Sequence, residues 1–192
     1  SMSNKGVELT LNYHHNSNGA PETFKFDIGG NISRNVNLVT ELAPTVKQQQ
    51  YGGIRSLQTS IIVPGQPFGA FYGYKITGIY QSADDIANRP SYADARVGGP
   101  VYADLSGPNG TPDGIIDAND RTVIGSPHPD FIYSLSFNTS YHNFDLSMFF
   151  NGSQGNQIFD VTRYYTDFSA FDGAVSTRML DAWSPTNTGS MI

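Results

Sequence analysis

The sequence contains no cysteine, so disulfide bonds and thiol catalysis are excluded for this chain. A cysteine-free protein can occupy an oxidising or a reducing compartment, so this absence does not indicate a location. The sequence also has no run of about 18 apolar residues, the length that a membrane-spanning helix requires. The net charge of -6 argues against a basic surface for nucleic acid. Any membrane role must therefore depend on strands, and no nucleic-acid partner is expected.

Aromatic residues and glycine are plentiful, with 11 Tyr, 12 Phe and 20 Gly. The glycines indicate many turns, and 192 residues are enough for one all-β domain or two small ones. No internal repeat or low-complexity linker divides the chain, so residues 1–192 are treated as one segment. The first three residues, 1–3, are expected to be left over from cloning, because they contain no apolar stretch typical of a leader.

Residues 131–150 show the strongest pattern, in which apolar and polar side chains alternate along two arms. This period of two indicates β-strands, and His142 and Asn143 between the arms are the right length for a hairpin turn. One face of the first arm carries Phe131, Tyr133, Leu135, Phe137, Thr139 and Tyr141. In the second arm Phe144, Leu146, Met148 and Phe150 share a face, with Phe149 as an exception. This large apolar face could cover a protein core or face lipid.

A second hairpin is predicted from residues 7–13 and 24–33, which alternate in the same way. Residues 65–81 are aromatic and interrupted by glycine, and they predict a further strand. A short helix is expected over 82–90 with Ser82 as its N-cap, and another within 175–185. Residues 91–130 are rich in Gly, Pro and Asp and predict a loop long enough to be functional. The expected fold class is all-β, with antiparallel hairpins, long loops and one or two short helices.

The loop at 104–120 gathers acidic side chains within a short stretch. Ca²⁺ prefers several oxygen ligands from a flexible loop, so Asp104, Asp113, Asp117 and Asp120 are candidate metal ligands. No bidentate Glu closes this loop, however, and its spacing departs from the EF-hand pattern. The alternative is that these residues form Asx-turns, in which Asp and Asn bond their own backbone. Both interpretations stay open at this point.

Other groupings that could support catalysis are weaker. Adjacent His14 and His15 lie in an apparent turn, as do His128 and His142, and neighbours on a strand would point to opposite faces. Asp84 and Asp85 could be paired carboxylates for glycoside cleavage, but acids at a helix start are usually capping residues. No phosphate-binding glycine loop and no nucleophile with a base is evident. We therefore expect a protein that is not an enzyme.

Several stretches of the sequence resemble the C-terminal part of SusC/RagA-type transporters, which are TonB-dependent outer-membrane barrels of Bacteroidetes. The family pattern contains "DLNGDGxID", "DRTVIGNPxPDF" and "GFDLSLFFQGxxGN". The matching stretches here are "YADLSG", "DGIIDANDRTVIGSPHPDF", "NFDLSMFFNGSQGN", "GQPFGAFYGYKITGIYQS" and "AWSPTNT". Two departures occur, because "PNGTP" interrupts the acidic stretch and Ser106 and Ser126 replace the usual Asn.

The resemblance implies that residues 1–192 form part of a large transmembrane β-barrel, whose plug domain and final strands are absent here. The apolar face would then meet outer-membrane lipid, and Tyr133 and Tyr141 would belong to the aromatic girdles. The turn at 142–143 would be periplasmic, and the acidic loop extracellular. The lumen would be lined by Ser134, Ser136, Asn138, Asp145 and Ser147.

The resemblance further implies that the parent protein imports a large nutrient, a glycan or an oligopeptide, with energy from a TonB complex. An SusD-like surface lipoprotein would be its partner in the cell outer membrane, and no catalytic residue or certain cofactor is expected. The alternative is a soluble secreted β-domain that binds carbohydrate or protein, with or without Ca²⁺. For that function Tyr72, Tyr74, Tyr80, Tyr164 and Tyr165 would be exposed for stacking on sugars, and otherwise they would pack in a girdle or core. A structural surface protein or adhesin has no supporting motif.

Overall fold

A computed structural model describes residues 1–16, 24–55, 57–167 and 173–192 of the chain. The chain forms two compact units that interleave along the sequence. Unit 1 consists of Ser1–Gln49, Ile61–Ala70 and Gly125–Ile158, and unit 2 of Gln50–Ser60, Phe71–Ile124 and Phe159–Ile192. Each unit is described by itself below.

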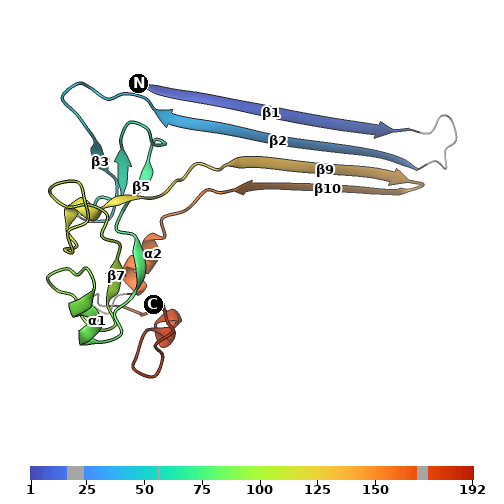
Figure 1. The fold of residues 1–192 in the computed structure, drawn as a ribbon. Coiled ribbons are helices and arrows are strands. Elements are labelled where there is room, and N and C mark those ends of the chain that lie inside the picture. Colours follow the sequence, from blue (N-terminus) through green and yellow to red (C-terminus); the bar gives the residue numbers. More distant parts are fainter. Residues whose placement is uncertain (17–23, 56, 168–172) are drawn as a thin grey trace. The chain divides into compact units, whose positions relative to one another are not determined.

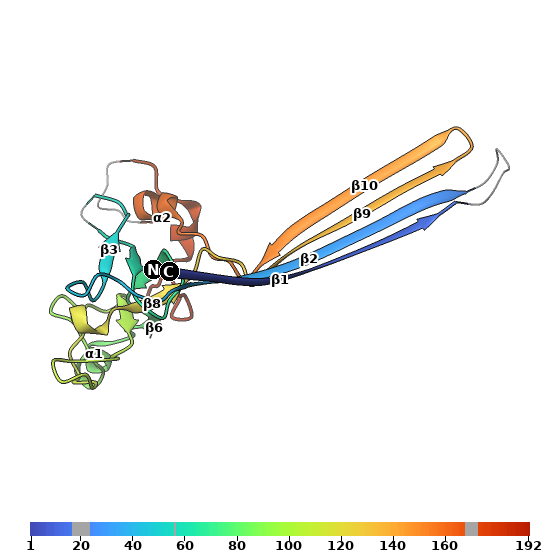
Figure 2. The same cartoon turned by 90° about the horizontal axis from the view of Figure 1, so that it is seen from above.

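Unit 1 is dominated by an antiparallel sheet of four long strands in the order β1-β2-β9-β10 (Figures 1 and 2). The spatial order follows the chain order, so the sheet is a simple up-and-down arrangement. Its strands are β1 (Met2–His15), β2 (Lys25–Val39), β9 (Phe131–Tyr141) and β10 (Phe144–Gln154). The structure confirms both predicted hairpins and the antiparallel all-β fold class.

The two ends of this sheet differ in the chain segments that they carry. At one end, called the turn end, β9 and β10 are joined by His142 and Asn143, and His142 adopts the positive φ of 53° that such tight turns require. β1 also ends and β2 also begins at this end, where His15 lies opposite Phe26. At the opposite end, called the loop end, β2 ends and residues 40–130 lead from it to β9. The chain that follows β10 also starts at this end. The short turn at His142 and Asn143 and the long segment 40–130 therefore lie at opposite ends of the sheet.

Unit 2 is built from short elements around a small core. Tyr80 is completely buried and its hydroxyl donates to the Pro90 carbonyl at 2.6 Å, while Val101 and Ile116 pack as further buried residues. Its regular elements include β6 (Ile76–Ile79), β7 (Pro100–Tyr102), α1 (Ala83–Asn88), η1 (Ala118–Asp120), α2 (Val161–Thr166) and η2 (Thr177–Asp181). Within the described part of the chain, no helix has the length and apolar character needed to cross a membrane.

A further sheet has the strand order β3-β4-β5-β8. Its short strands are β3 (Gln49–Tyr51), β4 (Ser60–Ile62), β5 (Ala70–Gly73) and β8 (Thr122–Gly125). Ile61 and Ala70 are its buried residues. The sequence between 40 and 63 shows only weak alternation, and short strands of three or four residues explain why.

Two predicted elements differ from the structure, and one is confirmed. Residues 65–81 form two strands in different sheets, β5 and β6, because Tyr74 packs on Tyr102 at 5.0 Å between ring centroids and β6 pairs with β7. The helix expected within 175–185 is the short 3-10 helix η2. The helix α1 is confirmed, and the backbone N–H of Asp85 donates to the Ser82 hydroxyl at 3.1 Å as predicted for an N-cap.

Candidate functional site

The apolar side chains of unit 1 form one continuous face, because the strand register aligns them. Ile32 of β2 lies opposite Leu9 of β1 on one side and Tyr133 of β9 on the other. Residues opposite each other in a sheet share a face, so the alternation of each strand adds up across the sheet. The large members of this apolar face are Val7, Leu9, Leu11, Tyr13, Phe26, Ile28, Ile32, Tyr133, Leu135, Phe137, Tyr141, Phe144, Leu146, Met148 and Phe150.

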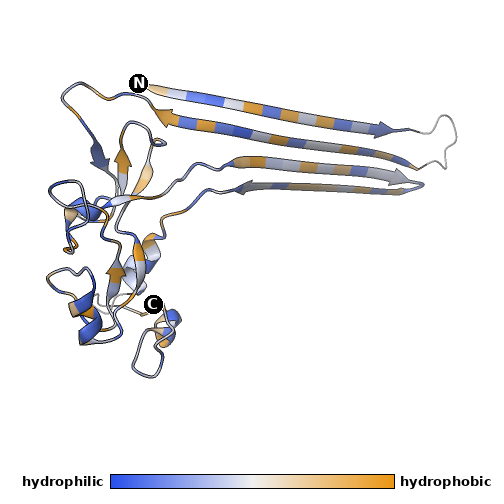
Figure 3. Ribbon diagram, in the orientation of Figure 1, coloured by the Kyte–Doolittle hydropathy of each residue, from blue (hydrophilic) through white to orange (hydrophobic). Residues whose placement is uncertain are grey.

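This apolar face is open to its surroundings. Val7 is 70% exposed, Leu11 67% and Phe144 80%. No second layer of unit 1, as far as the structure describes it, packs across the strands, and the alternation of hydropathy is visible along them (Figures 1 and 3). Soluble monomers seldom expose apolar patches beyond a few hundred Å². An uncovered face of four long strands therefore indicates an apolar partner such as lipid.

The opposite face is lined with small polar side chains. Asn31 donates to the Glu8 carboxylate at 2.5 Å and to the Thr10 hydroxyl at 3.2 Å, so hydrogen bonds run across the strands. The five residues predicted for a lumen, Ser134, Ser136, Asn138, Asp145 and Ser147, all lie on this polar face. Ile132 and Phe149 are apolar exceptions on this face, and Met2 and Val39 are two more at its loop end.

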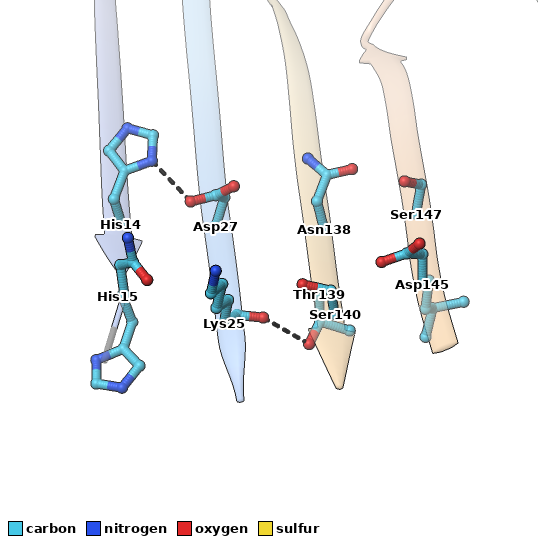
Figure 4. Close-up of a pocket in the computed structure, with 11 residues that line it drawn as sticks. His14, His15, Lys25, Asp27, Asn138, Thr139, Ser140, Asp145 and Ser147 are labelled. Carbon is cyan, nitrogen blue, oxygen red and sulfur yellow. Dashed lines mark hydrogen bonds and ion pairs between the residues drawn. The ribbon is translucent and has the colours of Figure 1, made fainter. Parts of the chain in front are cut away.

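The polar face holds an open pocket of about 610 Å³ near the turn end (Figure 4). The His14 ring nitrogen Nδ1 lies 2.8 Å from a carboxylate oxygen of Asp27, and the Thr139 hydroxyl donates to the Lys25 carbonyl at 2.9 Å. Further lining residues are His15, Asn16, Asn138, Ser140, Asp145, Leu146 and Ser147. Both members of the His14–Asp27 pair are more than half exposed, so the pair contributes about 0–1 kcal/mol to stability. The pocket offers donors and acceptors to a polar ligand or to another part of a protein.

The prediction that His14 and His15 lie in a turn is wrong. Both belong to β1, which continues to His15, because His14 lies opposite Asp27 of β2 and its ring nitrogen is within hydrogen-bond distance of the Asp27 carboxylate. The partner lies on a different strand, so only the strand register could have revealed the pairing. His142 does occupy a turn, and His128 lies in the loop before β9, where its ring nitrogen Nε2 is 2.8 Å from the Phe68 carbonyl oxygen.

The predicted metal ligands of unit 2 lie along one loop, and their carboxylates accept backbone hydrogen bonds. Asp104 accepts from the N–H groups of Asp113 at 3.3 Å and Gly114 at 2.7 Å. Asp117 and Asp120 form a reciprocal capping box around η1. Asp113 and Asp117 each accept the N–H group two residues further on, from Ile115 at 3.0 Å and from Asn119 at 2.7 Å, which are the contacts of an Asx-turn. No group of three metal-type side chains gathers among residues 1–16, 24–55, 57–167 and 173–192. The Ca²⁺ assignment to these aspartates stays a prediction.

Asp120 is fully buried and organises this loop. One carboxylate oxygen accepts the N–H groups of Leu105 at 2.7 Å and Ser106 at 3.1 Å, and the other accepts that of Asp117 at 2.9 Å. Burial alone would raise the pKa of Asp120, but these three backbone donors together lower the pKa below its ordinary value. The Asp120 side chain is therefore ionised, and its hydrogen bonds hold the backbone of the loop in place.

The remaining candidates take structural roles. Asp85 pairs with Arg89 at 2.7 Å and accepts the Gln81 N–H at 3.1 Å, as expected of an acid at a helix start. Tyr80 is completely buried, as the core-packing interpretation predicts, and is not available for stacking on a sugar. Tyr72 has the Arg121 guanidinium 4.7 Å from its ring centroid.

Comparisons with known proteins support a common origin with TonB-dependent receptors. Two proteins of Formosa agariphila, TonB-dependent receptors P3 and P26, are 33% and 31% identical to this chain over 98% and 100% of its length. The chain spans less than a fifth of these relatives, 18% and 19% respectively. No family model matches the chain.

The fold is also found in solved structures. A structure of the RagAB peptide transporter superimposes with a TM-score of 0.69 at 19% identity, covering 98% of this chain and 19% of that one. The RagAB peptide importer in an "open-open" state gives 0.67 over 97% of this chain and 18% of the other. At this identity the likeness establishes the fold, while the sequence matches establish the relationship. The chain belongs to the TonB-dependent receptors, and it corresponds to one segment of such a protein.

Proposed function

We propose that the chain forms part of the wall and the outer loops of an outer-membrane β-barrel that imports a large nutrient. The observation that carries this proposal is the four-stranded sheet of unit 1, whose apolar face is open and whose other face is polar. Lipid satisfies the first face and a water-filled lumen the second. Strands of 11 to 15 residues are also long enough to cross the hydrocarbon core at the usual tilt.

The same sheet suggests an orientation. Outer-membrane barrels have short periplasmic turns and long extracellular loops. The turn end, with His142 and Asn143, is accordingly periplasmic, and residues 40–130 extend outside. The polar face with its pocket near His14 then faces the lumen at the periplasmic side. A plug domain and the closing strands would be supplied by other parts of the parent protein.

The cargo is a glycan or an oligopeptide, and a TonB complex supplies the energy. The RagAB structures that share the fold are described as a peptide importer, which favours the peptide as the first cargo to test. An SusD-like lipoprotein is the proposed partner at the outer surface. No step of bond chemistry is part of this function, because movement of the plug opens the path.

The alternative, a soluble β-domain that binds sugar or protein, requires a cover for the apolar face. It also loses one of its stacking candidates, because Tyr80 is buried. Its remaining support is the other tyrosines of unit 2, of which Tyr165 is exposed, while the Tyr74 ring already packs on Tyr102.

Cysteine accessibility in the full receptor tests the proposal. Asn109, in the acidic loop, and Asn143, in the β9–β10 turn, are each replaced by cysteine in a receptor that is otherwise free of cysteine. In intact cells a membrane-impermeant maleimide should label Asn109→Cys and not Asn143→Cys. Permeabilising the outer membrane should make both sites reactive. Equal labelling of both sites in intact cells, or recovery of the receptor in the soluble fraction, would contradict the proposal.

A further inference from the structure

The apolar face of unit 1 carries only two charged side chains within the described strands, and both are cations. Lys5 lies opposite Val36, and Arg34 lies opposite Val7 on the neighbouring strand. All carboxylates of the four strands, those of Glu8, Asp27 and Asp145, lie on the other face. The sheet therefore separates charge by sign, apart from Lys25 and the titratable histidines.

The position of the two cations along the strands is informative. Between the row of Ile32 and Tyr133 and that of Tyr141 and Phe144, eight residues along β9, the apolar face carries no Lys, Arg or carboxylate, whereas Val7 and Val36 lie in the rows of the two cations. At about 3.3 Å per residue and a tilt of about 40°, this distance spans about 20 Å of membrane depth. Arg34 lies one row beyond Ile32, at about 25 Å, which is the usual height of an apolar band. Lys5 lies one row further toward the loop end, at the depth of the headgroups.

The turn end of the apolar face has no permanent cation among the described residues. Its border is formed by Tyr141 and Phe144, with His15 nearby. The asymmetry points to an anion that is present in one leaflet, at the loop end. Neither Lys5 nor Arg34 makes an ion pair or a hydrogen bond with any described residue through its side chain, so both charges are available. Both residues are exposed.

We propose that Lys5 and Arg34 form a binding site for the phosphate groups of a phosphorylated glycolipid in the outer leaflet of the membrane. The inference rests on the proposed function, because it needs the loop end to lie outside. An arginine binds phosphate through two parallel N–H donors, and lysine contributes a flexible point charge whose apolar stem can lie along the sheet. Adjacent strands place the two side chains on one face, a diagonal step apart, so one headgroup can reach both.

Asp130 is the competing partner for Arg34. Both residues line a shallow groove of about 200 Å³ at the loop end, with Val36, Pro67 and His128 among the other lining residues. Arg34 is not ion-paired with Asp130 in the described structure, so its guanidinium can turn toward the membrane. An Asp130→Asn variant separates these two possibilities, because it should leave lipid binding unchanged if Arg34 binds lipid.

The test uses the full receptor in nanodiscs of zwitterionic phosphatidylcholine, titrated with bisphosphorylated lipid A. Native mass spectrometry measures the lipid bound per receptor. The double variant Lys5→Gln/Arg34→Gln is compared with Lys25→Gln, which removes a cation from the turn end of the same sheet. Each interfacial cation contributes about fivefold to binding of an anionic lipid, so the double variant should bind about 25-fold more weakly. The Lys25→Gln variant should bind like the wild type.

Three further measurements distinguish a lipid phosphate from free phosphate, and a failure of this inference from a failure of the proposed function. Dephosphorylated lipid A should bind wild type and double variant equally weakly, and free inorganic phosphate should not compete at comparable concentration. Added salt should weaken binding to the wild type, which tests the site without any substitution. Undiminished binding by the double variant, or binding that does not respond to salt, would overturn the inference. A wild-type receptor that fails to enter nanodiscs would instead overturn the proposed function.

Discussion

Replacing Phe137 with arginine should prevent stable assembly of the receptor in the outer membrane. Phe137 lies at the middle of the apolar face, between Ile28 of β2 and Met148 of β10. In the proposed orientation this position is close to the bilayer midplane. Arginine there must enter the hydrocarbon or displace the sheet toward the interface.

The magnitude follows from two terms. Removing the phenylalanine side chain from an apolar environment costs ~2 kcal/mol. Placing arginine on the lipid face at the midplane costs a further ~2–4 kcal/mol. The sum of about 4–6 kcal/mol is comparable to the whole stability of many domains, about 5–15 kcal/mol.

Asn138 provides the matched control, because it is the next residue on the same strand. It lies on the polar face, opposite Asp27 of β2 and Ser147 of β10. Arginine at this position is exposed to water and close to a carboxylate, so the expected change is within about 0.5 kcal/mol. The two variants carry the same new side chain and differ only in the face that presents it.

Assembly is measured as the fraction of receptor in purified outer membranes that migrates as the folded form in unheated gel electrophoresis. The Phe137→Arg variant should be depleted and the Asn138→Arg variant should match the wild type. Normal assembly of both variants would refute the lipid assignment of the apolar face. Loss of Asn138→Arg alone would show that the two faces are inverted.

Three other outcomes are expected. Replacing His142 by glycine in the two-residue turn should stabilise the β9–β10 hairpin by up to about 1 kcal/mol, seen as a higher unfolding temperature, since His142 has a positive φ of 53° that glycine adopts more readily. The depressed pKa of Asp120 means that its stabilisation is present at neutral pH and above its ordinary value of 3.8, and is lost as pH falls further. Hydrogen exchange at Leu105 should therefore accelerate relative to intrinsic rates in acid, and Asp120→Asn should remove this dependence and weaken protection at neutral pH by about 1–3 kcal/mol. Millimolar Ca²⁺ should leave the unfolding temperature unchanged, because Asp104 already accepts two backbone N–H groups; a rise that EDTA reverses and Asp113→Asn abolishes would establish the metal site instead.

The long strands were predictable from the sequence because the alternation of apolar and polar residues within each strand reflects its two different faces. Every second residue of β9 faces the same surroundings, so the period of two identified the strand, its apolar face and the Phe149 exception without any knowledge of its neighbours. The helix α1 was equally local, since Ser82 and Asp85 act within one turn. Such features depend on contacts close in sequence.

The features that the sequence did not predict depend on strand pairing and hydrogen bonds between residues that are distant in the sequence. The sequence of residues 70–79 predicts one aromatic strand. In the structure the Lys75 carbonyl accepts a hydrogen bond from the Ala103 N–H, and β6 pairs with β7 instead of continuing β5. The strand assignment of His14 depends on Asp27, and the role of Asp120 on the N–H groups of Leu105 and Ser106. A count of acids in the loop could not separate a metal ligand from a carboxylate that already accepts backbone hydrogens.

The two faces of the sheet also use glycine in different ways, and this difference bears on what each face contacts. On the apolar face, a side chain at Gly152 would collide with the Tyr133 ring, with a Cβ only 2.6 Å from the ring carbon, so the tyrosine lies across the glycine. The aromatic ring thus covers the backbone of the glycine on the neighbouring strand, an arrangement that also helps to fix the register of β9 and β10. On the polar face, a Cβ at Gly29 would lie 2.7 Å from the Ser136 hydroxyl and 2.8 Å from the Asn12 amide oxygen. Small residues there keep polar groups of three strands within reach of one another, an arrangement that suits a wet surface and not a sealed protein core.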